Sequence, residues 1–479
     1  VEQMNLFKDM VCYQEEVRDP SRMAEVLNRV IEKAIRGSAP AQINVPRDYW
    51  TQVIDIELPP IVRLERQGGG EEAITKAAKL LSDAKFPVIL SGAGVVIGGA
   101  IEDCKKLAEK LDSPVCSGYQ HNDSFPGSHP LAVGPLGYNG SKAAMQLISK
   151  ADVVLALGTR LNPFSTLPGY GLDYWPKDAK IIQVDMNSDR IGLTKKVTVG
   201  ICGDAKLVSQ QILEKLSSKA GEKGREERKN LIHQTKSAWL QTLTSLDHED
   251  DDPGTVWNKE ARERDNDRMS PRQAWRAIQA GMPEDVIISS DIGNNCAIGN
   301  AYPTFEKGRK YLAPGLFGPC GYGFPSILGA KIGCPDTPVI GFAGDGAFGI
   351  SMNEMSSCAR KEWPKITMVI FRNYQWGAEK RNSILWFDDN FVGTELDPEL
   401  SYAKVANACG LKGVTVKTME ETTKAIKQSC EDQKKGITTF IEIILNQELG
   451  EPFRRDAMKK PAKVAGIKKE DMKPQKSLI

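Results

Sequence analysis

The residues of this chain best suited to binding chemistry are two oxygen donors, Asp345 and Asn373, which stand 28 positions apart. Gly344 and Gly346 flank the aspartate, so the chain can turn sharply there. A carboxylate and an amide oxygen beside a glycine turn and a helix N-terminus suit a hard divalent cation that bridges to a phosphate group. The helix terminus alone offers roughly half a positive charge, against about two to three negative charges on a diphosphate. We therefore expect a metal ion at this place.

Two short apolar runs must position these donors. Val339–Ala343 has the length and composition of a buried parallel strand, and Ile366–Phe371 is a second such run. Between them, helical spacing is shown by Phe348, Met352, Met355 and Ala359. Pro364 closes this predicted helix, so the segment indicates a βαβ unit with both strand ends at one edge of a sheet. The alternative is a plain strand-to-helix turn in which Asp345 only caps the helix.

The placement of the two donors resembles the fingerprint of the thiamin diphosphate-dependent enzymes, a GDG triplet followed some two dozen residues later by two asparagines. Here Arg372 stands at the first asparagine position and Asn373 at the second. The resemblance implies that Mg²⁺ is held by Asp345, Asn373 and the backbone carbonyl of Gln375. It also implies that thiamin diphosphate is bound by Gly344, Asp345, Gly346, Ala347, Asn373, Gln375, Trp376 and Gly377.

Two further segments are expected to contact this cofactor. After the strand predicted at 286–289, polar residues at its carboxyl end are placed to bind diphosphate oxygens, although a helix N-cap is the alternative. These residues are Asp291, Gly293, Asn294 and Asn295. The segment 318–325, GPCGYGFP, resembles the G-x-M-G-x-G-x-P segment of acetolactate synthases. The resemblance implies that the Gly318 carbonyl holds the aminopyrimidine and that Cys320, smaller than the usual methionine or leucine, wedges the cofactor into its bent conformation.

The bulk properties exclude several classes of function. A length of 479 residues predicts two to four domains, and a net charge of +1 gives no electrostatic footprint for nucleic acid. No uninterrupted apolar run is long enough to cross a bilayer. Ten cysteines without a CxxC pair indicate free thiols and a cytoplasmic protein, and four histidines make a zinc site or a histidine-driven hydrolase an unexpected outcome.

The alternation of apolar runs predicts an α/β fold of parallel-sheet domains, and the resemblance implies three-layer domains of the thiamin diphosphate enzyme type. Five parts are expected: the end of a pyrimidine-binding domain (1–58), a central doubly wound domain (72–217), a charged connector (218–267), the cofactor and Mg²⁺ domain (268–450) and a basic tail (451–479). Helices are predicted at 72–84, 100–112, 141–151, 205–216, 231–243, 271–280, 401–409 and 419–433. Further strands are predicted at 87–90, 114–117, 153–157, 180–184, 414–416 and 438–445.

The first part contains a predicted helix followed by a strand at 41–45. The apolar face of that helix is expected at Met23, Leu27, Val30 and Ala34. The stretch closes on Pro46-Arg47-Asp48, which resembles the end of the family's pyrimidine-binding domain. In that family a glutamate near the start of the domain activates the cofactor, and no residue of this sequence occupies that motif. We therefore expect that this chain is part of a longer protein, with further residues before Val1. The family's sites combine two subunits, so a homodimer or homotetramer is also expected.

Within the family, residues 341–364 and 371–396 resemble the sulfoacetaldehyde acetyltransferases. This resemblance implies the conversion of sulfoacetaldehyde and phosphate to acetyl phosphate and sulfite. Both substrates are anions, and Lys380 and Arg381 are the predicted catalytic residues that bind them, with Arg372 as a further candidate. A solvated helix face is the alternative for the Lys-Arg pair. The other functions left open are an acetolactate synthase-like carboligase or other 2-oxoacid decarboxylase, and a cofactor-binding fragment without activity.

Overall fold

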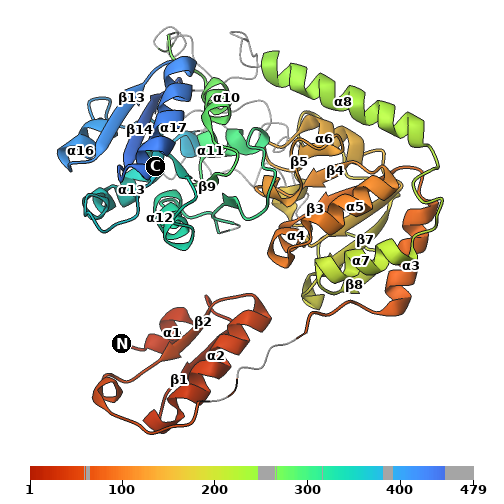
Figure 1. Ribbon diagram of the computed structural model, residues 1–479, viewed down its shortest axis with the longest axis horizontal. Helices are drawn as coiled ribbons and strands as arrows, with labels where there is room; N and C mark the ends of the chain where they lie inside the picture. Colours follow the sequence, from red (N-terminus) through yellow and green to blue (C-terminus); the bar gives the residue numbers. More distant parts are fainter. Residues whose placement is uncertain are drawn as a thin grey trace, which may run out of the picture. The chain divides into compact units, whose positions relative to one another are not determined.

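The computed structural model describes residues 1–58, 60, 65–245, 265, 267–315, 317–380 and 392–447 (Figure 1). The chain divides into two compact units, residues 1–66 and residues 67–479. In the described part, no helix has the length and apolar composition needed to cross a membrane.

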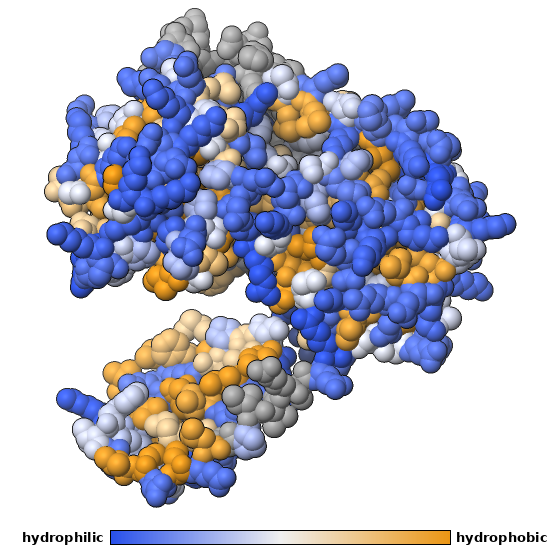
Figure 2. All heavy atoms as spheres, in the orientation of Figure 1, coloured by the Kyte–Doolittle hydropathy of each residue, from blue (hydrophilic) through white to orange (hydrophobic). Residues whose placement is uncertain are grey.

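The first unit is built on one pair of parallel strands, β1 (Tyr13–Glu16) and β2 (Ala41–Asn44), with helices α1 (Gln3–Phe7) and α2 (Met23–Gly37). The small core of this unit contains Val17, Val26 and Val30. The predicted apolar face of α2 is confirmed at Met23 and Val30 but wrong at Leu27, which is 42% exposed, because Val26 is buried in its place. Figure 2 shows further apolar side chains on the visible surface of this unit.

The second unit begins with a doubly wound parallel sheet, as predicted, in the order β5-β4-β3-β6-β7-β8. Its strands are β3 (Pro87–Ser91), β4 (Val115–Ser117), β5 (Ala132–Pro135), β6 (Val153–Leu157), β7 (Lys180–Asp185) and β8 (Val199–Cys202). Its helices are α3 (Glu71–Asp83), α4 (Ala93–Gly98), α5 (Ile101–Leu111), α6 (Lys142–Ile148) and α7 (Ala205–Lys215). Helices α5 and α7 lie side by side against this sheet (Figure 1). Helix α8 (Arg225–Ser245) follows and is longer than the predicted 231–243.

A second parallel sheet carries the predicted site, in the order β10-β9-β11-β12-β14-β13. Its strands are β9 (Ile287–Ser290), β10 (Tyr311–Leu312), β11 (Val339–Gly344), β12 (Thr367–Arg372), β13 (Lys412–Val416) and β14 (Thr439–Ile444). Its helices are α10 (Pro271–Gly281), α11 (Asn294–Ile298), α12 (Gly323–Gly333), α13 (Asp345–Ser351), α14 (Met355–Cys358), α16 (Tyr402–Ala408) and α17 (Met419–Lys434). The single helix predicted up to Pro364 is wrong, because a 3₁₀ turn at Met352–Glu354 separates α13 from α14.

The two faces of this sheet pack against aromatic clusters that fix the strand register. On one face Trp275 lies against Phe342 and Phe371, with ring centroids 4.8 and 5.4 Å away. On the other face Phe324 contacts Phe348 at 5.5 Å. Because successive side chains of a strand point to opposite faces, a slip of one residue would bring every buried side chain to the wrong face. The register pairs Gly344 of β11 with Phe371 of β12, so the residues that follow the two strands are neighbours.

Candidate active site

A cavity of about 670 Å³ lies at the carboxyl ends of β9, β11 and β12, the edge at which the sequence predicts a site. Of the predicted residues, its lining includes Gly293, Asn294, Asn295, Gly318, Cys320, Gly344, Asp345, Gly346, Ala347, Asn373, Gln375, Trp376 and Gly377. The βαβ argument for the placement of Asp345 beside Asn373 thus agrees with the observed arrangement of the chain.

The carboxylate of Asp345 is buried, with 1% of the residue exposed. Its Oδ1 accepts a hydrogen bond from the Gly346 N–H at 2.9 Å, and its Oδ2 accepts one from the Tyr374 N–H at 2.7 Å. Oδ2 also accepts from Nη1 of Arg372 at 3.1 Å. Burial raises the pKa of Asp345 to about 6, and the Arg372 guanidinium acts in the opposite direction. With one hydrogen bond on Oδ1 among the described residues, a lone pair of that oxygen remains for a ligand.

The turn after β12 carries the two other predicted metal ligands. Tyr374 has φ +61°, a left-handed conformation that side-chain-bearing residues rarely adopt, and it stands between Asn373 and Gln375. The Asn373 carbonyl accepts a hydrogen bond from Nε2 of Gln447 at 3.3 Å. Nε2 of Gln375 donates to the Gln447 carbonyl at 3.2 Å. The turn is therefore fastened by Gln447, which is not part of the described lining of the cavity.

Several buried polar atoms of lining residues have no hydrogen-bond partner among the described residues. They are Asn294 Nδ2, Asn295 Oδ1, Gln375 Oε1 and Thr394 Oγ1. A buried polar group without a partner costs about 1–3 kcal/mol, so such groups indicate a polar ligand. Gly346 lets the Trp376 ring pack closely on the turn, since a Cβ there would lie 2.8 Å from that ring, whereas a Cβ on Gly344 would meet no atom within 4 Å. The donor set and the cavity fit a diphosphate with a divalent cation.

Asp291 has a different position from the one predicted for a cofactor ligand, and the described lining of the cavity does not include it. Its Oδ1 accepts from the N–H groups of Ile292 (2.8 Å) and Gly321 (3.1 Å), and its Oδ2 accepts from that of Gly323 (2.7 Å). A carboxylate would also repel diphosphate oxygens. Asp291 therefore fixes the turn that carries Gly318 and Cys320, rather than facing the cavity itself.

The predicted anion-binding cations are not gathered at the cavity in the described part of the chain. Nζ of Lys380 lies 2.5 Å from Glu395 Oε1 and 3.3 Å from Gln447 Oε1, and the described lining omits it. Arg381 lies outside the described residues. Arg372 is 1% exposed and is bound to Asp345, so it does not offer its charge to a substrate.

The lining also contains residues that the sequence did not indicate, namely Ile292, Cys296, Ala378, Glu379, Val392, Gly393 and Thr394. The last three reach the cavity because their segment pairs with the turn after β12. The Trp376 N–H donates to the Thr394 carbonyl at 2.7 Å, and the Leu396 N–H donates to the Tyr374 carbonyl at 2.9 Å. This pairing is an isolated antiparallel bridge, and no apolar run in the sequence predicts a strand at either segment. The adjacent glycine and threonine at 393–394 are the only local signal of a turn.

Comparison with known proteins gives two family matches. Residues 74–215 match the central domain of thiamine pyrophosphate enzymes, and residues 291–443 match their C-terminal TPP binding domain. Thiamine pyrophosphate is the same molecule as thiamin diphosphate. The second match contains the whole βαβ unit of Asp345 and Asn373, together with the turn at Gly318.

Curated relatives extend the likeness to nearly the whole chain. A protein of Rhizobium meliloti (strain 1021) named probable sulfoacetaldehyde acetyltransferase is 76% identical over 478 residues, covering 100% of this chain and 81% of the relative. A sulfoacetaldehyde acetyltransferase of Roseovarius nubinhibens is 74% identical over 475 residues, covering 99% and 79%. Among solved structures, benzoylformate decarboxylase from Polynucleobacter necessarius matches with a TM-score of 0.72 at 19% identity, covering 94% of this chain and 78% of that one. That structure shows the likeness of fold alone.

Proposed function

This chain belongs to the thiamine pyrophosphate enzyme family, in the group of the sulfoacetaldehyde acetyltransferases, and we propose that it converts sulfoacetaldehyde and phosphate to acetyl phosphate and sulfite. The observation that carries this proposal is the 76% identity with a probable sulfoacetaldehyde acetyltransferase over 478 residues. Fold alone does not select a reaction, because this fold serves several chemistries. The reaction is inferred instead from the sequence identity with the named acetyltransferases.

For the cofactor, we propose that Asp345, the side chain of Asn373 and the carbonyl of Gln375 would hold the Mg²⁺ that accompanies thiamin diphosphate. Oxygen ligands of this kind are the ones that Mg²⁺ prefers, usually together with substrate or cofactor phosphates. Support comes from the lone pair left on Oδ1 of Asp345 and from the way Gln447 fastens the turn. When bound, thiamin diphosphate supplies the carbon nucleophile that attacks carbonyl groups.

The protein's own contribution is binding, orientation and exclusion of water. Asn294, Asn295 and Thr394 offer buried polar atoms that a ligand can pair with. Asp291 holds the turn at Gly321 and Gly323 through the two backbone N–H groups of these glycines, so the wall formed by the Gly318 segment keeps its shape. Such preorganised contacts need no rearrangement when a ligand binds, which is the advantage of a site built on strand ends.

The function is tested by incubating the protein with Mg²⁺, thiamin diphosphate, sulfoacetaldehyde and phosphate, and by measuring sulfite and acetyl phosphate. We expect both products in equal amounts, with no sulfite when phosphate and cofactor are left out. Formation of acetolactate from pyruvate without sulfite release would instead favour a carboligase, the class named for several relatives at 27–28% identity. Cofactor binding without either product would indicate the inactive alternative.

We further propose that the working protein is a cytoplasmic homodimer or homotetramer. All ten cysteines are free, in keeping with a reducing compartment. Light scattering of the protein with cofactor should give the mass of two or four chains. An active monomer would contradict the proposed assembly without affecting the proposed reaction.

The pair Lys380 and Arg381 gives a matched prediction about anion binding. Because Glu395 already neutralises Lys380 in a partly exposed ion pair, Lys380→Ala should change the KM for either anion by less than about 3-fold. Arg381→Ala should raise both KM values by about 10-fold or more, the loss of one charge-assisted hydrogen bond. Steady-state sulfite release, with each substrate varied in turn, measures both variants. A larger effect in Lys380→Ala than in Arg381→Ala would reverse the assignment.

The pH dependence of metal binding follows from Asp345. Burial raises its pKa from 3.8 to about 6 in the metal-free protein, so the folded state opposes ionisation of this group between those values. Mg²⁺ binds the carboxylate and competes with the proton, so its affinity should be highest above pH 6. Below pH 6 we expect it to fall by about tenfold per unit. Metal titrations at saturating thiamin diphosphate between pH 5 and 8, corrected for metal binding to free cofactor, measure this; a flat profile would contradict it.

A further inference from the structure

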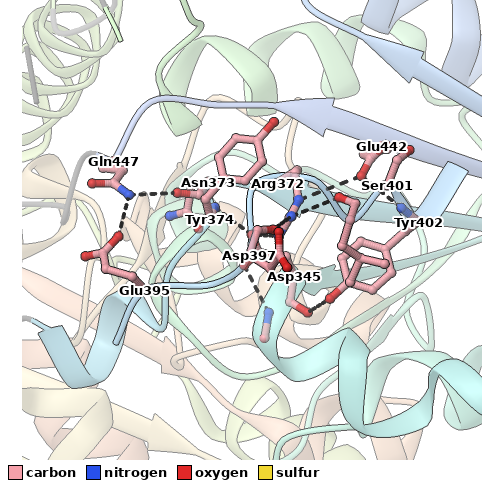
Figure 3. A network of polar contacts seen from close by, with 12 residues as sticks. Asp345, Arg372, Asn373, Tyr374, Glu395, Asp397, Ser401, Tyr402, Glu442 and Gln447 are labelled. Atoms are coloured by element: carbon pink, nitrogen blue, oxygen red, sulfur yellow. Dashed lines mark hydrogen bonds and ion pairs between the residues drawn. The ribbon is translucent and has the colours of Figure 1, made fainter. Parts of the chain in front are cut away.

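Arg372 is a buried cation in contact with the proposed metal site, and its side chain meets three separate parts of the fold (Figure 3). Nη1 donates to Asp345 Oδ2 at 3.1 Å. Nη2 donates to the carbonyl of Leu400 at 2.9 Å and to that of Asp397. Nε lies 3.8 Å from Oε1 of Glu442. One planar group thus links the start of α13, β14 and the segment before α16.

The same guanidinium also packs on the turn after β12. Its central carbon lies 4.2 Å from the centroid of the Tyr374 ring, a cation–π distance. Tyr374 has the left-handed conformation described above, which costs of order 1–3 kcal/mol and persists only where its surroundings hold it. A second arginine, Arg268, lies 5.0 Å from the same ring. The turn between the two proposed ligands Asn373 and Gln375 is therefore held by its central residue.

A third contact ties the aspartate backbone to the same region. The hydroxyl of Tyr402 donates to the Asp345 carbonyl at 2.8 Å, and the Tyr402 N–H donates to Glu442 at 3.0 Å. Ser401 donates its hydroxyl to the other Glu442 oxygen at 2.7 Å. The start of α16 thus contacts Asp345 directly, and it contacts Arg372 through the carbonyl of Leu400.

Stability alone is a weak explanation for this arginine. Desolvating a buried ion pair commonly offsets its Coulombic attraction, so a well-packed apolar side chain often serves stability as well. Anion binding is no better an explanation, because the described lining of the cavity omits Arg372 and two of its nitrogens already donate to the protein. What distinguishes Arg372 is that it touches the groups on which all three proposed metal ligands depend.

We propose that Arg372 is a positioning residue of the metal site. Through Oδ2 it orients the Asp345 carboxylate so that the lone pair on Oδ1 faces the cavity. Through the ring of Tyr374 it holds the turn that presents the Asn373 side chain and the Gln375 carbonyl. This inference rests on the proposed Mg²⁺ site. It gives a role to Arg372, which stands at the position of the first asparagine in the fingerprint described above.

The test compares Arg372→Met, which removes the charge and the donors, with Arg372→Lys, which keeps the charge without the planar fork. Arg360→Met is the matched control, since Arg360 lies in the same βαβ unit, is 62% exposed and pairs with Glu362. Mn²⁺ replaces Mg²⁺ as the probe, and the paramagnetic resonance signal of free Mn²⁺ at saturating thiamin diphosphate gives the bound fraction. Circular dichroism melts identify variants that fail to fold.

We expect Arg372→Met to weaken Mn²⁺ binding by about 10- to 100-fold, the range for residues that orient metal ligands, and Arg372→Lys by a smaller factor. The KM for phosphate at saturating metal should change by less than about 2-fold, and Arg360→Met should match the wild type. If Arg372→Met does not fold, Arg372→Lys decides. Unchanged Mn²⁺ affinity in the folded variants overturns the inference, as does a raised phosphate KM with unchanged affinity. Failure of the wild type to bind Mn²⁺ overturns the metal site itself, which is a distinguishable result.

Discussion

Replacement of Asp345 by alanine should abolish metal-dependent binding of thiamin diphosphate, weakening it by about 100-fold or more, which corresponds to about 3 kcal/mol. The substitution deletes the one charged ligand of the proposed Mg²⁺ site. It also removes the carboxylate that accepts from Arg372 Nη1 at 3.1 Å, which leaves Glu442 at 3.8 Å from Nε, and it leaves the Tyr374 N–H without its acceptor. Removal of one partner of a buried pair typically costs 3–5 kcal/mol, so the turn after β12 should loosen as well.

Two controls separate the loss of charge from the loss of shape. Asp345→Asn keeps an oxygen for the Tyr374 N–H but removes the charge, so it should lose metal dependence with less damage to stability. Asp336→Ala, an exposed aspartate that precedes β11, should behave as the wild type. Titration of the cofactor against tryptophan fluorescence, with and without Mg²⁺, gives the affinities, since Trp376 lines the cavity. Wild-type affinity in Asp345→Ala would refute the assignment of this residue.

Replacement of Asp291 by alanine should have the second large effect, on folding rather than on metal binding. The Asp291 carboxylate accepts three backbone hydrogen bonds, from Ile292, Gly321 and Gly323. A buried N–H left without an acceptor costs about 1–3 kcal/mol, and the bond from Gly323 is buried while the other two are partly buried, so the free energy of unfolding should fall by about 3 kcal/mol. The turn that carries Cys320 should become mobile, and cofactor affinity should fall because that wall of the cavity is no longer fixed.

Denaturant unfolding of Asp291→Ala and Asp291→Asn measures this effect. The asparagine variant retains one oxygen and should lie between alanine and the wild type. Hydrogen exchange at Gly321 and Gly323 should accelerate in both variants and stay unchanged in Asp345→Ala. If Asp291 instead contacted diphosphate directly, its removal would weaken cofactor binding without any change in stability.

The fold is largely predictable where a strand is a short, mainly apolar run, as in β11 and β12. Such a run is typical of a strand that is buried on both faces of a sheet. Strands β5 and β8 have only four residues each with an internal glycine, so their sequences cannot be told from those of loops. The broken helix after Asp345 follows from Gly349 and Ser351, poor helix formers whose effect the apolar spacing hides. In α2 helical spacing allows either Val26 or Leu27 beside Met23 and Val30, and packing in the core selects Val26.

At the site, residues close in sequence within one βαβ unit could be placed together, and the cavity indeed gathers Asp345, Asn373 and Gln375. The roles of charged residues were harder to predict, since a carboxylate at a strand end may face a ligand or the backbone. Asp291 faces the backbone because the turn at Gly321 and Gly323 brings its N–H groups there. Lys380 lies beside its partner Glu395 through a pairing for which the sequence carries little signal beyond the glycine and threonine at 393–394.

That pairing of 374–376 with 394–396 has an evolutionary consequence. Backbone hydrogen bonds from Trp376 and Leu396 close the two ends of the intervening stretch against each other. The entropy of closing a chain segment grows only slowly with its length, so the number of residues between the two paired ends should have little effect on the pairing itself. Relatives of this chain could therefore differ in the spacing of the paired ends, while Asp345, Asn373 and Gln375 keep their places at the cavity.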